Sequence, residues 1–238
     1  MTKILAHRGA SGYAPENTMA AFELAAEQGA HGIETDIHLT KDGKLAVTHD
    51  PVLGRTVKAE GALKDYTLAE LQSFDCGSWY SPDFSKERVP ELKDLLSFIK
   101  KQDMYLNIEI KMGIGYYHGL EEVLAEELGR FNEDERLIIS SFNHYSLLAL
   151  EKLRPSTPRG FLTGSFLIDS WDYVKKNRGQ ALHPHFHCVT TEIVEACHRE
   201  GIAVNPYTIN EPVEGKELLK TGVDSLITNY PDLMLNLL

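Results

Sequence analysis

Three kinds of feature are scarce in this 238-residue chain, and each scarcity argues against a class of protein. The cysteines Cys76, Cys188 and Cys197 are odd in number and widely spaced, which fits neither a disulfide framework nor a zinc site. No apolar run approaches the roughly 18 residues of a transmembrane helix. The apolar start is too short for a signal peptide, because the polar residues 7–9 interrupt it. We therefore expect a cytoplasmic protein without stable membrane insertion.

Positive charge is scarce as well. The chain carries 24 Lys and Arg against 35 Asp and Glu, a formal net charge of −11. A nucleic-acid binder usually presents a basic face, so nucleic acid is not an expected partner. An anionic substrate would gain nothing from the overall field, so it would have to be held by local cations. The length suits one large α/β barrel or two small domains.

Apolar, β-rich runs alternate with helix-period runs along most of the chain. This alternation predicts eight parallel strands, at 3–7, 32–38, 105–110, 136–141, 159–163, 180–184, 202–207 and 224–228. The first helix should be capped by Asn17, reach about Gln28 and be closed by Gly29. We expect a (β/α)8 TIM barrel in a single domain, 1–238. An open doubly wound sheet is disfavoured because no GxGxxG turn follows the first strand.

Two segments depart from the alternation. Asp42-Gly43 lies between two β-like runs with no room for a helix, which predicts a hairpin with 45–48 antiparallel to 32–38. The stretch 51–89 is rich in Gly, Pro, Asp and Ser, and contains one short helix indicated by the capping box from Thr67 to Glu70. We interpret 51–89 as an insertion on the same rim of the barrel as the hairpin.

Carboxylates gather at two predicted strand ends. Residues i and i+2 of a strand share a face, so Glu34 and Asp36 point one way, as do Glu109 and Lys111. In a (β/α)8 barrel the functional residues lie at the carboxyl ends of the strands. Three convergent carboxylates repel one another unless a cation lies between them, and oxygen ligands suit Mg²⁺ or Ca²⁺. The alternative is that each pair forms surface salt bridges.

Two histidines stand out as proton carriers, because imidazole titrates near neutral pH. His7 and His49 each precede a charged residue at a predicted strand end, and together they could serve as general base and general acid. Arg8 offers a planar fork of donors suited to phosphate oxygens, and Lys111 adds a second positive charge. We interpret four further histidines as structural: His31, His118, His144 and His198.

The stretch His183-Pro184-His185-Phe186-His187 raises the possibility of a zinc site. Pro184 fits poorly in a central strand, and no Cys or acidic residue is close in sequence, so we favour His185 as a residue that lines a pocket. Tyr207 could pack over the carbon skeleton of a substrate, or it could simply pack against other side chains on the barrel rim. The same two roles are open for Phe142. Asn210 is expected to cap the next helix.

The motifs, taken in order, resemble those of the glycerophosphodiester phosphodiesterases. The matching motifs are HRG (7–9), ENT (16–18), ETD (34–36), DG (42–43), HD (49–50), EIK (109–111), SSF (140–142), YTIN (207–210) and TNYPD (228–232). The combination of HRG, E-x-D and HD after a DG hairpin is specific, whereas each motif alone is weak. Many members read W-T-V-N where this chain has YTIN, which keeps an aromatic residue at Tyr207 but leaves substrate preference open.

The resemblance implies a barrel like that of the phosphoinositide-specific phospholipases, with one divalent cation held by Glu34, Asp36 and Glu109. It implies His7 and His49 as the acid/base pair, and Arg8 and Lys111 as phosphate ligands. The reaction would convert a small-molecule glycerophosphodiester to sn-glycerol 3-phosphate and an alcohol. The glycerol 2-hydroxyl would attack first to give a cyclic phosphate.

Three alternatives stay open at the level of sequence. A lysophospholipid-cleaving enzyme would need an apolar groove, which the 51–89 insertion could provide. A metal-dependent amidohydrolase would need H-x-H on the first strand, whereas the chain reads Ala6-His7-Arg8. A non-catalytic barrel that binds a glycerophospho ligand is disfavoured because no member of the catalytic set is missing. Barrel helices often offer a flat face to a second copy, so a homo-oligomer is also possible.

Overall fold

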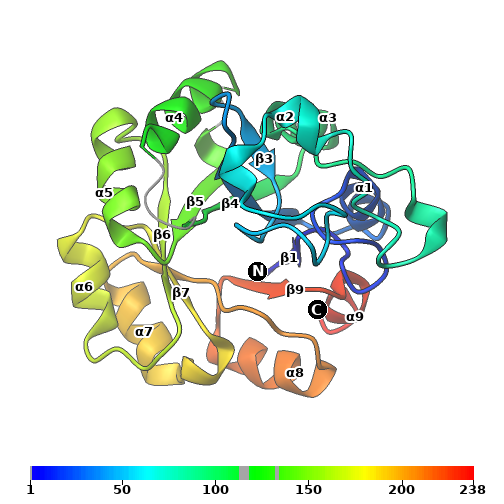
Figure 1. Cartoon of the computed structure of the whole chain (residues 1–238). Helices are drawn as coiled ribbons and strands as arrows, with labels where there is room; N and C mark the ends of the chain where they lie inside the picture. Colours follow the sequence, from blue (N-terminus) through cyan, green and yellow to red (C-terminus); the bar gives the residue numbers. More distant parts are fainter. Residues whose placement is uncertain (1, 113–117, 132–133) are drawn as a thin grey trace.

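Eight parallel strands form a nearly closed barrel with helices around it, as predicted (Figure 1). The structure is a computed structural model, and it describes residues 2–112, 118–131 and 134–238. The barrel strands are β1 (Lys3–His7), β2 (Gly32–Leu39), β4 (Tyr105–Ile110), β5 (Leu137–Ser141), β6 (Arg159–Thr163), β7 (Ala181–Pro184), β8 (Ala203–Val204) and β9 (Ser225–Thr228). Their spatial order, β8-β7-β6-β5-β4-β2-β1-β9, follows the order of the chain around the barrel.

Helices follow most of the barrel strands and bury one face against them. The α-helices are α1 (Met19–Glu27), α2 (Leu68–Leu71), α3 (Leu92–Gln102), α4 (Leu120–Phe131), α5 (His144–Leu153), α6 (Ser170–Lys176), α7 (Thr191–Arg199), α8 (Pro212–Thr221) and α9 (Pro231–Leu235). Short 3₁₀ turns are η1 (Leu63–Asp65), η2 (Pro82–Phe84), η3 (Asp134–Arg136) and η4 (Phe186–Cys188). The i, i+3, i+4, i+7 positions of α3 are buried, as its periodicity predicts: Leu92, Leu95, Leu96 and Ile99.

The strand predicted at 202–207 is wrong in length, because β8 covers only Ala203–Val204. Pro206 has no N–H to donate and therefore interrupts the ladder. The backbone still connects this segment to β9 through three hydrogen bonds: Asp224 N to Val204 O (2.9 Å), Ile227 N to Pro206 O (3.1 Å) and Ile209 N to Ile227 O (2.9 Å). The barrel is thus joined by irregular backbone at this one seam.

Two predicted helix caps are wrong. The N-cap of α1 is Thr18, whose hydroxyl accepts from Ala21 N, whereas Asn17 has a positive φ of 56° and turns its side chain into the barrel end. Likewise, α8 begins at Pro212 after Glu211, and the Asn210 side chain instead accepts a hydrogen bond from Asn229 N (3.0 Å). Asn17 and Asn210, which the sequence predicted as caps, thus make hydrogen bonds to distant parts of the chain instead.

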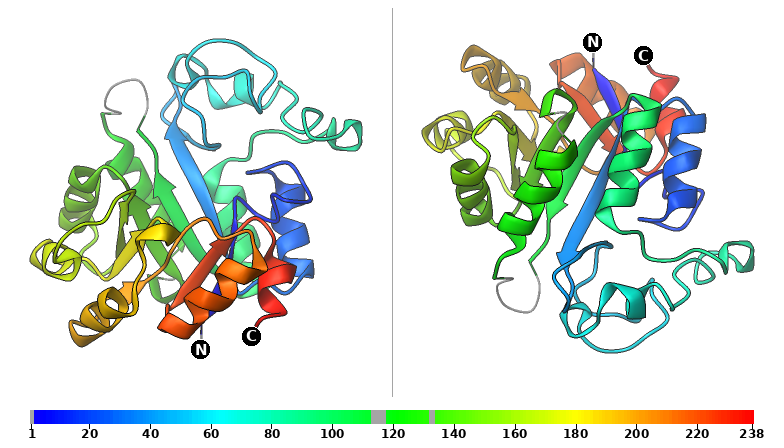
Figure 2. Two further views of the ribbon diagram at one scale, coloured as in Figure 1. Left: turned by 90° about the horizontal axis from the view of Figure 1, so that it is seen from below. Right: turned by 90° about the horizontal axis from the view of Figure 1, so that it is seen from above.

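The predicted hairpin is confirmed, since β3 (Leu45–Val47) pairs antiparallel with β2. Beyond it, residues 51–89 fold over the carboxyl ends of the strands, and Figure 2 (left) shows this cyan segment above the upper end of the barrel. The capping box of α2 is present, with Thr67 and Glu70 bonded reciprocally. The segment packs with Ala46 of β3 in a small apolar cluster of its own, made of Ala46, Leu53, Val57, Leu63, Leu68, Leu71, Cys76 and Val89.

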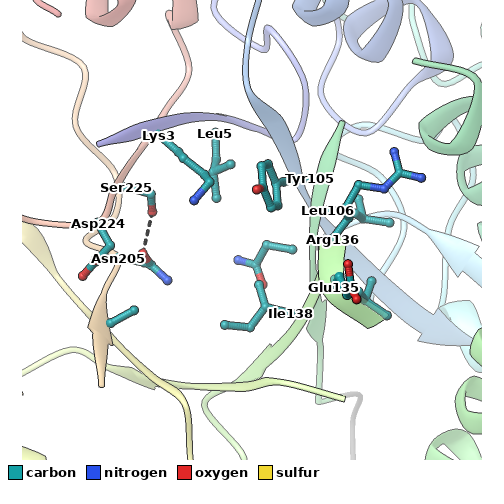
Figure 3. Close-up of a pocket in the computed structure, with 13 residues that line it drawn as sticks. Lys3, Leu5, Tyr105, Leu106, Glu135, Arg136, Ile138, Asn205, Asp224 and Ser225 are labelled. Carbon is teal, nitrogen blue, oxygen red and sulfur yellow. Dashed lines mark hydrogen bonds between the residues drawn. The ribbon is translucent and has the colours of Figure 1, made fainter. Parts of the chain in front are cut away.

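The opposite, amino-terminal mouth of the barrel holds a pocket lined by the first residues of the strands, among them Lys3, Tyr105 and Ser225 (Figure 3). The Lys3 ammonium lies over the Tyr105 ring, 4.6 Å from its centre. Ser225 Oγ donates to Asn205 Oδ1 (2.8 Å). In barrels of this kind the amino-terminal mouth serves stability, and the functional residues lie at the carboxyl ends of the strands. Within the described residues, every helix is too short or too polar to cross a bilayer.

Close packing of β2 against its neighbours gives a prediction for Gly32. A Cβ at this position would lie 2.6 Å from Tyr105 O and 2.7 Å from Leu5 Cδ2. Gly32→Ala should therefore lower the free energy of unfolding by about 1–3 kcal/mol, measured by urea denaturation. The matched control is Gly164→Ala, where nothing lies within 4 Å of the added carbon. Equal stability of the two variants would contradict this packing.

Candidate active site

Three carboxylates converge at the carboxyl ends of β2 and β4. In the parallel register Asp36 lies beside Glu109, and alternation along β2 turns Glu34 to the same side. Glu34, Asp36 and Glu109 are all buried, and each offers an oxygen within 4.8 Å of the other two. The sequence prediction that the three would lie together is met by this geometry.

Two cations lie against these carboxylates. Lys111 Nζ is 2.7 Å from Glu109 Oε1 and 3.2 Å from Asp36 Oδ1. Arg8 Nε is 3.2 Å from Asp36 Oδ2, and its Nη1 donates to Glu16 Oε1 (2.7 Å). The backbone N–H of Arg8 also faces the site and donates to Glu34 Oε2 (3.2 Å). Asp36 is thus held between the two cations.

The electrostatics of the three carboxyls differ. Burial raises the pKa of Glu34 well above its ordinary value, and the charges of Asp36 and Glu109 raise it further. Burial and Asp36 raise the pKa of Glu109 to about 7. Burial would also raise the pKa of Asp36, but Lys111 and Arg8 hold it below its ordinary value. The protein's own cations therefore compensate one carboxylate well and leave the other two short of positive charge.

Asn17 is a site residue whose role sequence reasoning missed. Its Nδ2 donates to Asp36 Oδ2 (2.8 Å), and its Oδ1 accepts from Thr35 Oγ1 (2.7 Å). Its backbone N–H donates to Arg8 O (3.0 Å), which fixes the turn after β1. A polar residue just before a helix is compatible both with a capping role and with a contact elsewhere in the fold. Only the tertiary contact with Asp36 shows which of these roles Asn17 has.

His7, the last residue of β1, is oriented by a residue from the other end of the chain. Its Nδ1 lies 2.6 Å from Asn229 Oδ1, so we assign the ring proton to Nδ1. This leaves the Nε2 lone pair facing Glu34, with 3.9 Å between His7 Nε2 and Glu34 Oε2. Burial lowers the pKa of His7 to about 4, with a further contribution from Arg8. The ring is therefore neutral at pH 7 and can accept a proton.

His49 is also held by hydrogen bonds. Its Nδ1 is 2.7 Å from Asp50 Oδ1, and its backbone carbonyl accepts from His38 Nε2 (2.8 Å). Arg55 Nε donates to Asp50 Oδ2 (2.6 Å), and the same guanidinium bonds both oxygens of Glu16. Burial also lowers the pKa of His49. Because Nδ1 is bonded to Asp50, Nε2 is the nitrogen left for chemistry.

A small cavity beneath the carboxylates is lined by Tyr207 together with His7, Glu34 and Glu109. The Tyr207 hydroxyl donates to Thr163 O (3.0 Å), so its ring rather than its hydroxyl faces the site. His185 packs edge-on against Tyr207, with 5.8 Å between ring centres, and stands outside the residues that line this cavity.

The three histidines of 183–187 do not come together as a metal site. His183 is fully buried and its Nε2 lies 3.0 Å from Asn205 Nδ2, whereas His187 is exposed on η4. Within the ranges that the structure describes, the one group of three or more His, Cys, Asp or Glu side chains with metal-ligand spacing is that of Glu34, Asp36 and Glu109.

Comparisons with known proteins agree with this geometry. The sequence profile of the glycerophosphoryl diester phosphodiesterase family matches residues 7–233. The chain belongs to this family. A glycerophosphodiester phosphodiesterase of Caldanaerobacter subterraneus subsp. tengcongensis is 42% identical over 99% of this chain and 97% of its own length. One of Bacillus altitudinis is 39% identical over 98% of this chain and 96% of its own length.

A solved structure adds a ligand to the comparison. The phosphodiesterase OLEI02445 of Oleispira antarctica, in complex with the product sn-glycerol-3-phosphate, has a TM-score of 0.90 and 30% identity over 100% of this chain and 96% of its own. The resemblance inferred from the motifs is thus confirmed, as is the prediction that the chain is a glycerophosphodiester phosphodiesterase. The amidohydrolase alternative is set aside.

The contacts of His49 give a prediction for Asp50. Asp50→Asn keeps the shape but can no longer fix the Nδ1–H tautomer or attract Arg55, so kcat should fall roughly 10-fold to 100-fold. The comparison is Asp65→Asn in the same segment, an exposed carboxylate that should leave kcat unchanged. Measured turnover of Asp50→Asn within twofold of the wild type would show that His49 does not depend on this partner.

Proposed function

We propose that this protein hydrolyses glycerophosphodiesters to sn-glycerol 3-phosphate and an alcohol, with one divalent cation, and with His7 and His49 as the acid/base pair. The observation that carries the proposal is the convergence of three buried carboxylates, two cations and two histidines at one barrel end. The structural relative that holds sn-glycerol-3-phosphate supports the same substrate class.

Charge balance favours a divalent cation in this site. Glu34, Asp36 and Glu109 bring three negative charges, whereas Arg8 and Lys111 bring two positive ones. An added divalent ion turns the net charge of −1 into +1, which one phosphodiester anion then neutralises. The three carboxylates fit such an ion, because each has an oxygen within 4.8 Å of the others and all ligand atoms are hard oxygens. When bound, Mg²⁺ or Ca²⁺ would polarise the phosphate.

The two histidines carry the protons in the proposed mechanism. His7 Nε2 takes the proton of the glycerol 2-hydroxyl as that oxygen attacks phosphorus. The protonated ring of His49, whose Nδ1–H is bonded to Asp50, gives its Nε2 proton to the departing alcohol oxygen and becomes neutral. Water then opens the cyclic phosphate while the two histidines exchange roles, as microscopic reversibility requires. The Asn229 and Asp50 contacts bond Nδ1 of each ring, which leaves Nε2 of each ring for proton transfer.

Four further side chains would hold the substrate. Arg8 and Lys111 would share the charge that grows on the phosphate oxygens in the transition state. The Tyr207 ring would pack against the carbon skeleton, with His185 supporting that ring from its edge. The chain as a whole would work as one domain in the cytoplasm, with 51–89 as an insertion that supplies Arg55, and it could self-associate.

The function is tested by release of glycerol 3-phosphate from glycerophosphocholine in a dehydrogenase-coupled assay with Mg²⁺, Ca²⁺ or EDTA. The proposal expects release with at least one of the two ions and none in EDTA. Release that continues unchanged in EDTA would contradict the metal dependence. A failure to release product with either ion would contradict the substrate class.

Removal of either imidazole should slow the chemistry. We expect His7→Ala and His49→Ala each to lower kcat roughly 10²-fold to 10⁴-fold, the usual contribution of a positioned acid or base. The control is His118→Ala, an exposed histidine that should keep wild-type turnover. Steady-state kinetics on glycerophosphocholine measures all three, and near-wild-type turnover of both site variants would refute the acid/base assignment.

Removal of one carboxylate should remove the ion. Glu34→Ala should abolish turnover and weaken divalent-ion binding, measured by titration calorimetry, because it deletes one of three ligands. Glu121→Ala on α4, which lies outside the site, serves as control. If Glu34→Ala bound the ion as tightly as the wild type, the ion would have to lie elsewhere.

A further inference from the structure

The active-site cavity is lined by two buried polar atoms that have no hydrogen-bond partner within the described part of the chain. They are Asn107 Oδ1 and Ser140 Oγ. Asn107 is 1% exposed and Ser140 is fully buried. Native proteins seldom leave such atoms unpaired, because a buried polar atom that has lost its bond to water needs another partner. The cavity is therefore expected to hold a molecule that bonds both atoms.

The register of the barrel explains why these two atoms face the cavity. On β4, Asn107 precedes Glu109 by two residues, so both side chains point to the barrel interior. Asn107 is the partner of Glu34 on β2, and Ser140 is the partner of Glu109 on β5. The next residue, Ser141, faces the other way, and its Oγ donates to Ile110 O (2.7 Å). Each unpaired atom thus belongs to the strand neighbour of a candidate metal ligand.

The cavity has room for one water molecule. It leaves about 20 Å³ for the centre of a water, and a site of this size holds a water when polar partners surround it. Asn107 also lines the pocket at the amino-terminal mouth, which lies on the other side of its side chain (Figure 3). The side chain of Asn107 therefore closes the active-site cavity from below.

The hydrogen-bonding groups around the cavity select how this water is bound. Asn107 Oδ1 can accept one hydrogen of the water, and Ser140 Oγ can accept the other. The other polar atoms of the lining are the carboxylates of Glu34 and Glu109 and the Nε2 lone pair of His7. In the ionised carboxylates and the neutral imidazole, these atoms accept hydrogen bonds and cannot donate them. The oxygen lone pair of the water is thus left to face a cation.

We propose that Asn107 and Ser140 are positioning residues that hold a water ligand of the divalent ion; this rests on the function proposed above. The three carboxylates supply the charge that binds the ion, and the two neutral side chains fix a ligand that the protein itself does not supply. Partners that orient the ligands of a metal contribute about 10-fold to 100-fold to its affinity.

The test uses Mn²⁺ as the probe, because carboxylate and water ligands suit this ion as they suit Mg²⁺ and Ca²⁺. Electron paramagnetic resonance in water enriched in oxygen-17 counts the water ligands of bound Mn²⁺ from the broadening of its lines. The same signal, followed in a titration, gives the Kd. Both readouts are independent of catalysis.

Two variants address the two side chains separately. Asn107→Leu places methyl groups where the amide was, and it should lower the number of water ligands by one and raise the Kd for Mn²⁺ about 10-fold to 100-fold. Ser140→Ala removes only a hydroxyl that bonds no described side chain, so it should fold as the wild type does, and it should raise the Kd about tenfold. If Asn107→Leu does not fold, Ser140→Ala decides alone.

The matched control is Ser225→Ala at the amino-terminal mouth. Ser225 is also a buried serine of the barrel interior, but its Oγ donates to Asn205 Oδ1, away from the carboxylates. The control loses this hydrogen bond and should keep the wild-type Kd and number of water ligands.

Four outcomes would overturn the inference. An unchanged number of water ligands in Asn107→Leu, or an unchanged Kd in Ser140→Ala, would overturn it and leave the proposed function intact. Weaker binding with the full number of water ligands would mean that the two side chains act on the carboxylates directly. An equal effect of Ser225→Ala would make the change a general loss of stability. A wild type that binds neither Mn²⁺, Mg²⁺ nor Ca²⁺ would overturn the metal dependence of the proposed function, and the inference with it.

Discussion

The mutual repulsion of three buried carboxylates is the constraint on which this active site depends. Glu34, Asp36 and Glu109 lie where burial and one another's charge disfavour ionisation. Arg8 and Lys111 compensate Asp36 but leave the cluster short of positive charge. A divalent ion would supply the missing positive charge. The site with its ion would then carry a net positive charge, which would attract the phosphodiester anion. The shortage of positive charge around the three carboxylates thus affects both the stability of the native state and the binding of the substrate.

The barrel makes this arrangement possible because parallel register brings residues distant in sequence to one level. Asp36 lies beside Glu109 on the neighbouring strand, and His7 lies beside Glu34. Loops then orient what the strands place: Asn229 fixes the ring of His7, and Asp50 with Arg55 fixes that of His49. The amino-terminal mouth carries no comparable group among the described residues, in keeping with a structural role.

Much of the fold and the main site residues follow from local rules. Alternation within a strand predicts that Glu34 and Asp36 share a face. The alternation of apolar, β-rich runs with helix-period runs locates most strands within one residue. The missed features depend on long-range contacts: Asn17 binds Asp36 instead of capping α1, and Asn210 accepts from Asn229 instead of capping α8.

The most direct test compares the melting temperatures of the wild type and Glu34→Gln in EDTA and with saturating Mg²⁺ or Ca²⁺. Glutamine keeps the shape of Glu34 and removes one of the three repelling charges. The account predicts that Glu34→Gln melts at a higher temperature than the wild type in EDTA. It also predicts that the ion raises the wild-type melting temperature and has a much smaller effect on the variant, because an ion that binds only the native state stabilises it. A wild type that is as stable as Glu34→Gln in EDTA, and that does not respond to either ion, would contradict the account.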